Sequence, residues 1–88
     1  PDLNKFKCLK LAYEAIKWGH SYQVVLNAAN EVLVDSFLNK KIKYTMIPNG
    51  IEKIMKMYEL RKLETVDEIL NFDKEVREKT RELIANKM

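Results

Sequence analysis

The sequence has 88 residues, of which 47% are hydrophobic and 33% charged, so it provides for one hydrophobic core and no second domain. Glycine and proline occur only twice each, and helix formers are plentiful, which favours an all-α fold over a turn-rich β fold. The net charge of +3 is too small and too mixed to demand a polyanionic partner. No apolar run approaches the ~20 residues of a membrane span, so we expect no membrane partner.

The first residue is Pro1 rather than Met, in a polar stretch unlike a signal peptide. We therefore expect this chain to be part of a longer protein. Cys8 is the only cysteine, so it cannot form an intramolecular disulfide. Its position in an apolar helical pattern predicts a buried, unreactive thiol rather than a nucleophile.

The first predicted helix covers residues 6–18. Its charged residues fall at helical spacing on one narrow stripe, and nearly every other position is apolar; the stripe is Lys7, Lys10, Glu14 and Lys17. A helix with so narrow a polar stripe must be covered from several directions, either by other helices or by a neighbouring domain. Gly19 follows and is predicted to end this helix.

A second amphipathic pattern predicts a helix over about residues 27–38, with Leu33 and Phe37 on its apolar face. The start has two alternatives, because Ser21 can cap an early start and Asn27 a later one. The pattern favours the later start. His20 would then lie in a solvent-facing loop.

Residues 41–47 alternate between apolar and polar side chains, as strands do. No second strand is available to pair with them, so we interpret this segment as an extended connection whose apolar side packs on the helices. Pro48 suits the first turn of a third helix, which runs to about Leu60. The alternative is that Asn49 and Gly50 form a turn that delays the start of this helix.

Thr65 and Glu68 form a capping box, which predicts that a fourth helix begins at Val66. Its apolar positions keep helical spacing to the end: Ile69, Phe72, Val76, Thr80 and Leu83. Asn71 and Asp73 are candidates to bend this helix midway. Two charge pairs one turn apart predict a solvated outer face: Asp73 with Arg77, and Glu75 with Lys79. The predicted fold is an all-α, small four-helix bundle-like domain with one extended connecting segment.

The residues that carry chemistry are sparse. His20 is the only histidine, so no histidine-based zinc site can form. Glu31 and Asp35 lie one turn apart and are candidates to share a metal ion, but the E-x-x-H pattern is absent and a solvated carboxylate face is favoured. Gly19 and Gly50 stand alone and cannot form a phosphate-binding loop. We therefore predict no catalytic, cofactor-binding or metal-binding residue in this chain.

The best candidate for a nucleic-acid contact is a basic cluster, Lys40, Lys41 and Lys43, with Tyr44 beside it. Acidic residues interrupt the basic ones of the last helix, so no continuous positive face is predicted there. Because no continuous positive face is predicted, we expect no nucleic-acid partner. An autonomous helical interaction or nucleic-acid-binding module is kept as the alternative hypothesis.

Two stretches carry a resemblance: residues 6–12, Phe-Lys-Cys-Leu-Lys-Leu-Ala, and residues 26–32, Leu-Asn-Ala-Ala-Asn-Glu-Val. They resemble the C-terminal region of the 1-deoxy-D-xylulose 5-phosphate reductoisomerase family. The similarity continues through residues 66–70, Val-Asp-Glu-Ile-Leu, and covers essentially the whole chain. Lys7 stands where that family often has proline. We interpret Asn27 and Asn30 as capping and internal hydrogen-bonding residues rather than ligand contacts.

The resemblance implies that residues 1–88 are a single C-terminal helical domain, preceded in the parent enzyme by nucleotide-binding and catalytic domains. The implied parent is a homodimeric, NADPH-dependent oxidoreductase that uses a divalent metal, Mg or Mn. It forms 2-C-methyl-D-erythritol 4-phosphate in non-mevalonate isoprenoid biosynthesis. The implied role of this piece is to support the catalytic domain of the same chain, without activity or cofactors of its own. Bacterial cytoplasm and plastid (apicoplast-like) stroma both remain open as compartments.

Overall fold

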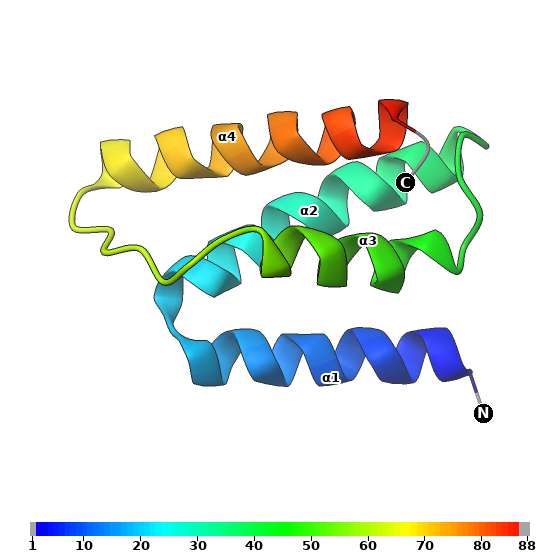
Figure 1. Ribbon diagram of the computed structural model, residues 1–88, viewed down its shortest axis with the longest axis horizontal. Helices are drawn as coiled ribbons and strands as arrows, with labels where there is room; N and C mark the ends of the chain where they lie inside the picture. Colours follow the sequence, from blue (N-terminus) through cyan, green and yellow to red (C-terminus); the bar gives the residue numbers. More distant parts are fainter. Residues whose placement is uncertain (1, 87–88) are drawn as a thin grey trace.

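The computed structural model describes residues 2–86. Its helices are α1 (Leu3–Trp18), α2 (His20–Leu38), α3 (Met46–Lys56) and α4 (Val66–Ala85). These residues form no strand, so the predicted all-α fold is confirmed. α2 and α3 lie in the middle, with α1 on one side and α4 on the other (Figure 1). Within the described residues, α1 contacts α2 and α3 but not α4.

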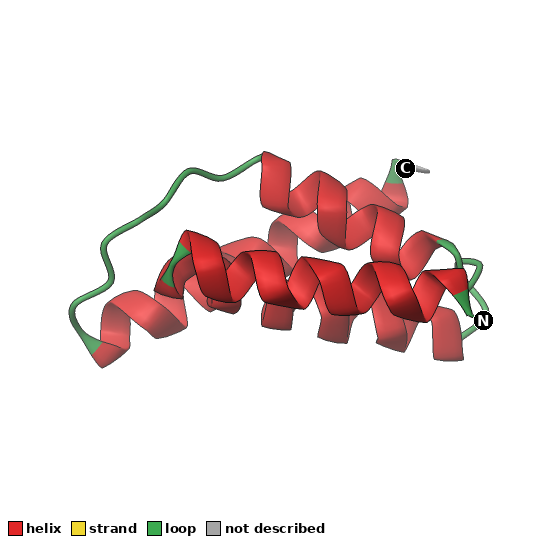
Figure 2. Ribbon diagram, turned by 90° about the horizontal axis from the view of Figure 1, so that it is seen from below, coloured by secondary structure: helices red, strands yellow, loops and turns green. Residues whose placement is uncertain are grey.

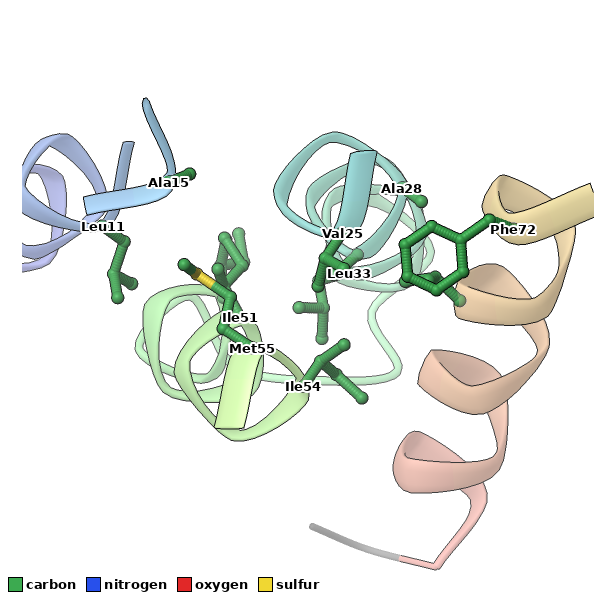
Figure 3. Packing of buried hydrophobic residues seen from close by; sticks show 12 residues of the cluster. Leu11, Ala15, Val25, Ala28, Leu33, Ile51, Ile54, Met55 and Phe72 are labelled. Carbon is green, nitrogen blue, oxygen red and sulfur yellow. The ribbon is translucent and has the colours of Figure 1, made fainter. Parts of the chain in front are cut away.

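The hydrophobic core lies where α2 meets the other three helices (Figure 3). α2 contributes small and branched side chains, among them Ala28 and Leu33, which are fully buried. Ile54 of α3 and Phe72 of α4 close the core from two sides. Because every helix contributes buried apolar side chains, the chain has a core of its own.

α1 begins at Leu3, three residues before the predicted start. The reason is a cap at Asp2, whose Oδ1 accepts hydrogen bonds from the backbone N–H groups of Asn4 (3.0 Å) and Lys5 (3.1 Å). The predicted end at Trp18 is confirmed, since the backbone N–H of Gly19 donates to the carbonyl of Ala15 at 3.3 Å.

α2 begins at His20, so the predicted start near Asn27 is wrong. Gly19 has φ 126° and ψ 171°, a conformation open almost only to glycine, and it reverses the chain without a loop. His20 is therefore an exposed helical residue rather than a loop residue. Ser21 is not the cap either: it is buried, and its Oγ accepts a hydrogen bond from the backbone N–H of Arg61 at 2.9 Å.

The connection between α2 and α3 covers residues 39–45 and is built of turns and bends, so the predicted extended segment over residues 41–47 is wrong. Its apolar side packs on the helices as predicted. Ile42 is half-buried against the core, and the Tyr44 ring lies 5.5 Å from the Phe37 ring. The connection ends in a turn, in which the Met46 N–H donates to the Lys43 carbonyl at 2.9 Å. α3 therefore begins at Met46, before Pro48, and includes residues 49–50 rather than being delayed by them.

α3 ends at Lys56, so the predicted end near Leu60 is wrong. Residues 57–65 instead leave the helix and run across the α1–α2 corner to the start of α4 (Figure 2). The hydroxyl of Tyr22 donates to the carbonyl of Tyr58 at 2.7 Å. Farther along, the Arg61 guanidinium lies 4.2 Å from the centre of the Phe72 ring. These long-range contacts hold the segment in an irregular path.

α4 begins at Val66, as predicted, because the Thr65 hydroxyl accepts a hydrogen bond from the Glu68 N–H at 3.1 Å. The helix is continuous to Ala85, so Asn71 and Asp73 do not interrupt it.

Charged side chains on α4 tie it to the rest of the domain. Arg77 donates to Asp73 at 2.7 Å, as predicted, and also pairs with Glu31 of α2. The predicted pair of Glu75 with Lys79 is wrong. Glu75 pairs with Arg61 at 3.3 Å, and Lys79 pairs with Glu82 at 3.8 Å. Arg61 and Arg77 each carry a contact between segments distant in sequence.

Candidate functional site

The most unusual surface of the domain is an apolar stripe along α1. Its side chains are between 55% and 77% exposed: Leu3, Phe6, Leu9, Tyr13 and Ile16. Their spacing of three or four residues places them on one side of the helix. Leu11 and Ala15 are the buried residues of α1. Large contiguous apolar surfaces on a small domain mark interaction sites, because leaving them in water is unfavourable.

The surface beside this stripe is hollowed in two places. One hollow of about 420 Å³ is lined by Phe6, Leu9 and Tyr13 together with the charged Lys10, Glu14 and Lys17. A second hollow of about 530 Å³ is lined by Asp2, Lys5, Phe6, Cys8 and Leu9. Both can receive apolar side chains of a partner, as grooves between helix ridges do. The surface around the apolar stripe of α1 therefore has a shape on which a partner can pack.

Three charged residues of α1 line the hollow toward α3: Lys7, Lys10 and Glu14. Lys7 Nζ donates to Asn49 Oδ1 at 2.8 Å and lies 3.3 Å from Glu52 Oε1. The hydrogen bond and positive charge of Lys7 lower the pKa of Glu52. Lys10 and Glu14 lie beside the same hollow between α1 and α3. We call this side, which carries Lys7, Lys10 and Glu14, the charged flank of α1.

The opposite flank of α1, toward α2, carries Asp2 and Lys5 beside Cys8 near the start of the helix and neutral side chains farther along. A hollow of about 210 Å³ lies there, and we call it the α1–α2 notch; it is lined by Cys8, Ala12, Leu26, Asn27, Asn30 and Ile51. Asn27 and Asn30 are exposed residues in the interior of α2. Neither side chain caps a helix or forms a hydrogen bond within residues 2–86, so their interpretation as internal hydrogen-bonding residues is wrong.

Cys8 lies between the stripe and the notch and is half-buried. Burial raises the pKa of its thiol above the ordinary value, because the charged thiolate is poorly solvated there. The thiol is thus half-buried rather than buried as predicted, and its raised pKa disfavours a nucleophilic role.

The carboxylates suggested for a metal ion do not form a site. Glu31 is engaged by Arg77, and Asp35 is exposed and accepts a hydrogen bond from Asn39 at 3.4 Å. Residues 2–86 contain no group of three or more His, Cys, Asp or Glu side chains placed to hold a metal ion. Gly19 and Gly50 belong to different elements. The donor set of the described chain therefore does not fit a divalent metal.

The basic cluster lies in the connection between α2 and α3, where Lys40, Lys41 and Lys43 are exposed. The Tyr44 hydroxyl donates to Asp2 Oδ2 at 3.2 Å, and that carboxylate raises the pKa of Tyr44. The cluster is thus bordered by an acidic group rather than extended by further basic ones. Separately, none of the helices within residues 2–86 combines the length and apolar character required to cross a membrane.

The chain is similar in sequence to a known family of protein domains. The protein family described as DXP reductoisomerase C-terminal domain matches residues 1–79. The 1-deoxy-D-xylulose 5-phosphate reductoisomerase of Clostridium perfringens is 54% identical over 78 residues, which cover 89% of this chain and 20% of that protein.

Two further proteins of the same name match similarly. That of Thermoanaerobacter pseudethanolicus is 52% identical over 79 residues, covering 90% of this chain and 21% of that protein. That of Proteus mirabilis is 42% identical over 85 residues, covering 97% and 21% respectively. The chain thus spans about a fifth of the length of the relatives that it matches.

Proposed function

Because the chain belongs to the family of DXP reductoisomerase C-terminal domains, we propose that it is the C-terminal structural domain of a 1-deoxy-D-xylulose 5-phosphate reductoisomerase. Its task is to support the catalytic part of the enzyme by docking through α1. The parent enzyme is proposed to be a homodimer. It rearranges and reduces 1-deoxy-D-xylulose 5-phosphate to 2-C-methyl-D-erythritol 4-phosphate with NADPH.

The observation that carries this proposal is the exposed apolar stripe of α1. α1 packs on α2 and α3 with one side only, while Phe6 and Tyr13 project from its other side with 69% and 68% of their surface exposed. About four-fifths of each relative lies outside the matched region. An apolar stripe of this kind is unfavourable in water, so we expect the remaining part of the parent chain to cover it.

The proposed division of labour follows from the chemistry of the described residues. No cluster of three or more metal-binding side chains occurs in residues 2–86, and the isolated glycines form no phosphate-binding loop. We therefore assign the NADPH site and the divalent metal, Mg or Mn, to the preceding part of the parent chain. In the absence of that part, this domain is expected to be inactive.

Calorimetric titration tests the proposal directly. The 88-residue chain is titrated into the parent enzyme truncated just before the position of Pro1, and NADPH oxidation on substrate is followed in parallel. We expect saturable binding and recovery of activity on mixing, with no activity from the 88-residue chain alone. Circular dichroism and urea denaturation first establish that each piece is folded.

A matched pair of variants distinguishes the contribution of the stripe to binding from that of exposed apolar surface elsewhere on the domain. Tyr13→Ser removes a 68% exposed ring from the stripe, and Leu70→Ser removes a 60% exposed side chain from α4. Tyr13→Ser is expected to weaken binding by about tenfold or more, consistent with loss of a large aromatic contact. Leu70→Ser should leave binding within about twofold. If folded pieces ignore each other, or both variants act equally, the docking role of α1 must be abandoned.

A further inference from the structure

We infer that the preceding part of the parent chain covers α1 on its flank toward α2, where its peptide groups hydrogen-bond to Asn27 and Asn30. This inference rests on the proposed function and specifies which surface next to the stripe is occupied. It assigns a binding role to the α1–α2 notch, which the resemblance leaves without one.

The charges on α1 distinguish its two flanks. On the charged flank, Lys7 is already engaged by Asn49 and Glu52 of α3, and Lys10 has 72% of its side chain exposed. Covering these groups would remove them from water, which is unfavourable unless the partner supplies matched charges. The notch is lined by neutral residues, so covering it carries no such penalty.

The two asparagines have an unusual placement that a partner explains. Asparagine is a weak helix former, yet Asn27 and Asn30 lie one turn apart in the interior of α2. Their amides are exposed and unused within residues 2–86. Each amide offers both a donor and an acceptor, the same pair that a peptide group presents. The uncharged lining of the notch favours a peptide backbone over a phosphate or carboxylate as occupant.

The notch and the stripe form one surface. Cys8 lines the α1–α2 notch and also the hollow that contains Phe6 and Leu9. Ala12, with its small side chain, lies on the α1 side of the notch. A segment that packs on Phe6 and Leu9 therefore passes beside Asp2 and Lys5 and then reaches the two amides across the uncharged lining of the notch.

Thiol accessibility in the full-length parent tests which flank is covered. Single variants Tyr13→Cys on the stripe, Asn27→Cys and Asn30→Cys in the notch, and Glu52→Cys on the α3 side of the charged flank are alkylated with iodoacetamide. Peptide mass spectrometry then compares the labelling rate at each position in the full-length parent and in the 88-residue chain. We expect labelling in the parent to be at least about tenfold slower at positions 13, 27 and 30, and within about twofold at position 52.

The outcomes separate this inference from the proposed function. If position 13 is protected while positions 27 and 30 react as fast as in the 88-residue chain, the notch is not the site, although docking stands. If position 13 is not protected either, the docking function itself fails. Protection at position 52 with none at position 27 would place the partner on the charged flank and overturn the inference.

The native Cys8 reports on the hydrogen bonds. In the parent, the double variant Asn27→Ala with Asn30→Ala should raise the alkylation rate of Cys8 on the order of tenfold, because two hydrogen bonds that hold the docked segment are lost. Gln23→Ala, which alters another exposed amide of α2, is the matched control and should leave the rate unchanged. An unchanged rate in the double variant would overturn the role of the amides.

Discussion

Leu60 packs over Gly19, at the corner where α1 turns into α2. A β-carbon built on Gly19 would stand 2.7 Å from Leu60 Cδ1, closer than real atoms approach. Gly19 also has φ 126° and ψ 171°, a region occupied almost only by glycine. The same residue therefore makes the sharp turn possible and leaves room for the α3–α4 connection to cross it.

Gly19→Ala is expected to destabilise the domain by about 1 to 3 kcal/mol, mainly through the backbone conformation. Urea denaturation of the 88-residue chain measures the effect. Leu60 is 63% exposed, so Leu60→Ala alone should be mild. The double variant relieves the contact but not the backbone strain. If the double variant recovered full stability, the contact rather than the backbone would be the cause.

Thr65→Ala should lower the free energy of unfolding by about 1 kcal/mol, since the hydroxyl that accepts the Glu68 N–H at 3.1 Å is lost. Thr45 provides a matched control, because it precedes α3 but forms no side-chain capping hydrogen bond. Thr45→Ala should therefore change stability by less than about 0.5 kcal/mol. Equal effects of the two substitutions in urea denaturation would contradict the capping role of Thr65.

The comparison of these two threonines shows what sequence could predict about the fold. The start of α4 was predictable because Thr65 and Glu68 are three residues apart and act locally. The start of α2 was not, because it depends on Gly19 adopting a rare conformation and on Ser21 bonding to Arg61, forty residues away in the chain. The early end of α3 has the same origin, since Tyr58 and Arg61 are held by residues of α2.

The candidate site was predictable in the same limited way. The charged residues of α1 are confined to a narrow part of the helix surface, which indicates that its apolar surface exceeds what one neighbouring helix can cover. Sequence could not show that Leu11 is buried and Tyr13 exposed, because most residues of α1 are apolar and these two are not distinguished by their type. Nor could it show that Asn27 lies within α2, since an asparagine before an apolar run is typical of a cap. Helix packing decides both points.

The three phenylalanines occupy three different environments. Phe72 is 2% exposed, Phe37 is half-buried against the core, and Phe6 is 69% exposed. Truncation to alanine is expected to cost about 3 to 5 kcal/mol at Phe72. It should cost roughly half as much at Phe37, and less than about 0.5 kcal/mol at Phe6 in the 88-residue chain.

Urea midpoints of the three variants at equal protein concentration check this order. The result at Phe6 is the most informative, because a folded variant with unchanged stability would establish that this ring serves no purpose in the isolated domain. A large loss of stability at Phe6 would instead mean that the ring is buried, and would contradict the exposed stripe.

Tyr22 and Tyr58 lie together, but their hydroxyl groups differ. The Tyr22 hydroxyl donates to the Tyr58 carbonyl at 2.7 Å, whereas the Tyr58 hydroxyl is buried without a hydrogen-bond partner in the described chain. Tyr22→Phe should therefore cost about 1 kcal/mol. Tyr58→Phe should be neutral or stabilising by up to about 1 kcal/mol, because an unsatisfied buried polar group is removed. Thermal and urea denaturation at pH 7 distinguish the two variants.

The Tyr58 phenol also predicts a pH dependence on the alkaline side. Burial, with the negative charge of Glu75 adding to it, raises the pKa of Tyr58 above its ordinary value of 10.0. At pH values above 10 the unfolded chain releases this proton while the folded chain retains it, so stability that is fully present below pH 10 is lost as the pH rises through the folded pKa.

The free energy of unfolding of Tyr58→Phe should therefore fall less steeply above pH 10 than that of the unchanged protein. All other side chains are the same in both proteins, so their contributions cancel in the difference between the two curves. This includes Tyr44, whose pKa is raised by its exposed contact with Asp2. The Tyr44→Phe variant measures the contribution of Tyr44 separately. If the curves of the unchanged protein and Tyr58→Phe ran parallel from pH 8 to about pH 11, the Tyr58 hydroxyl would have to be solvated rather than buried.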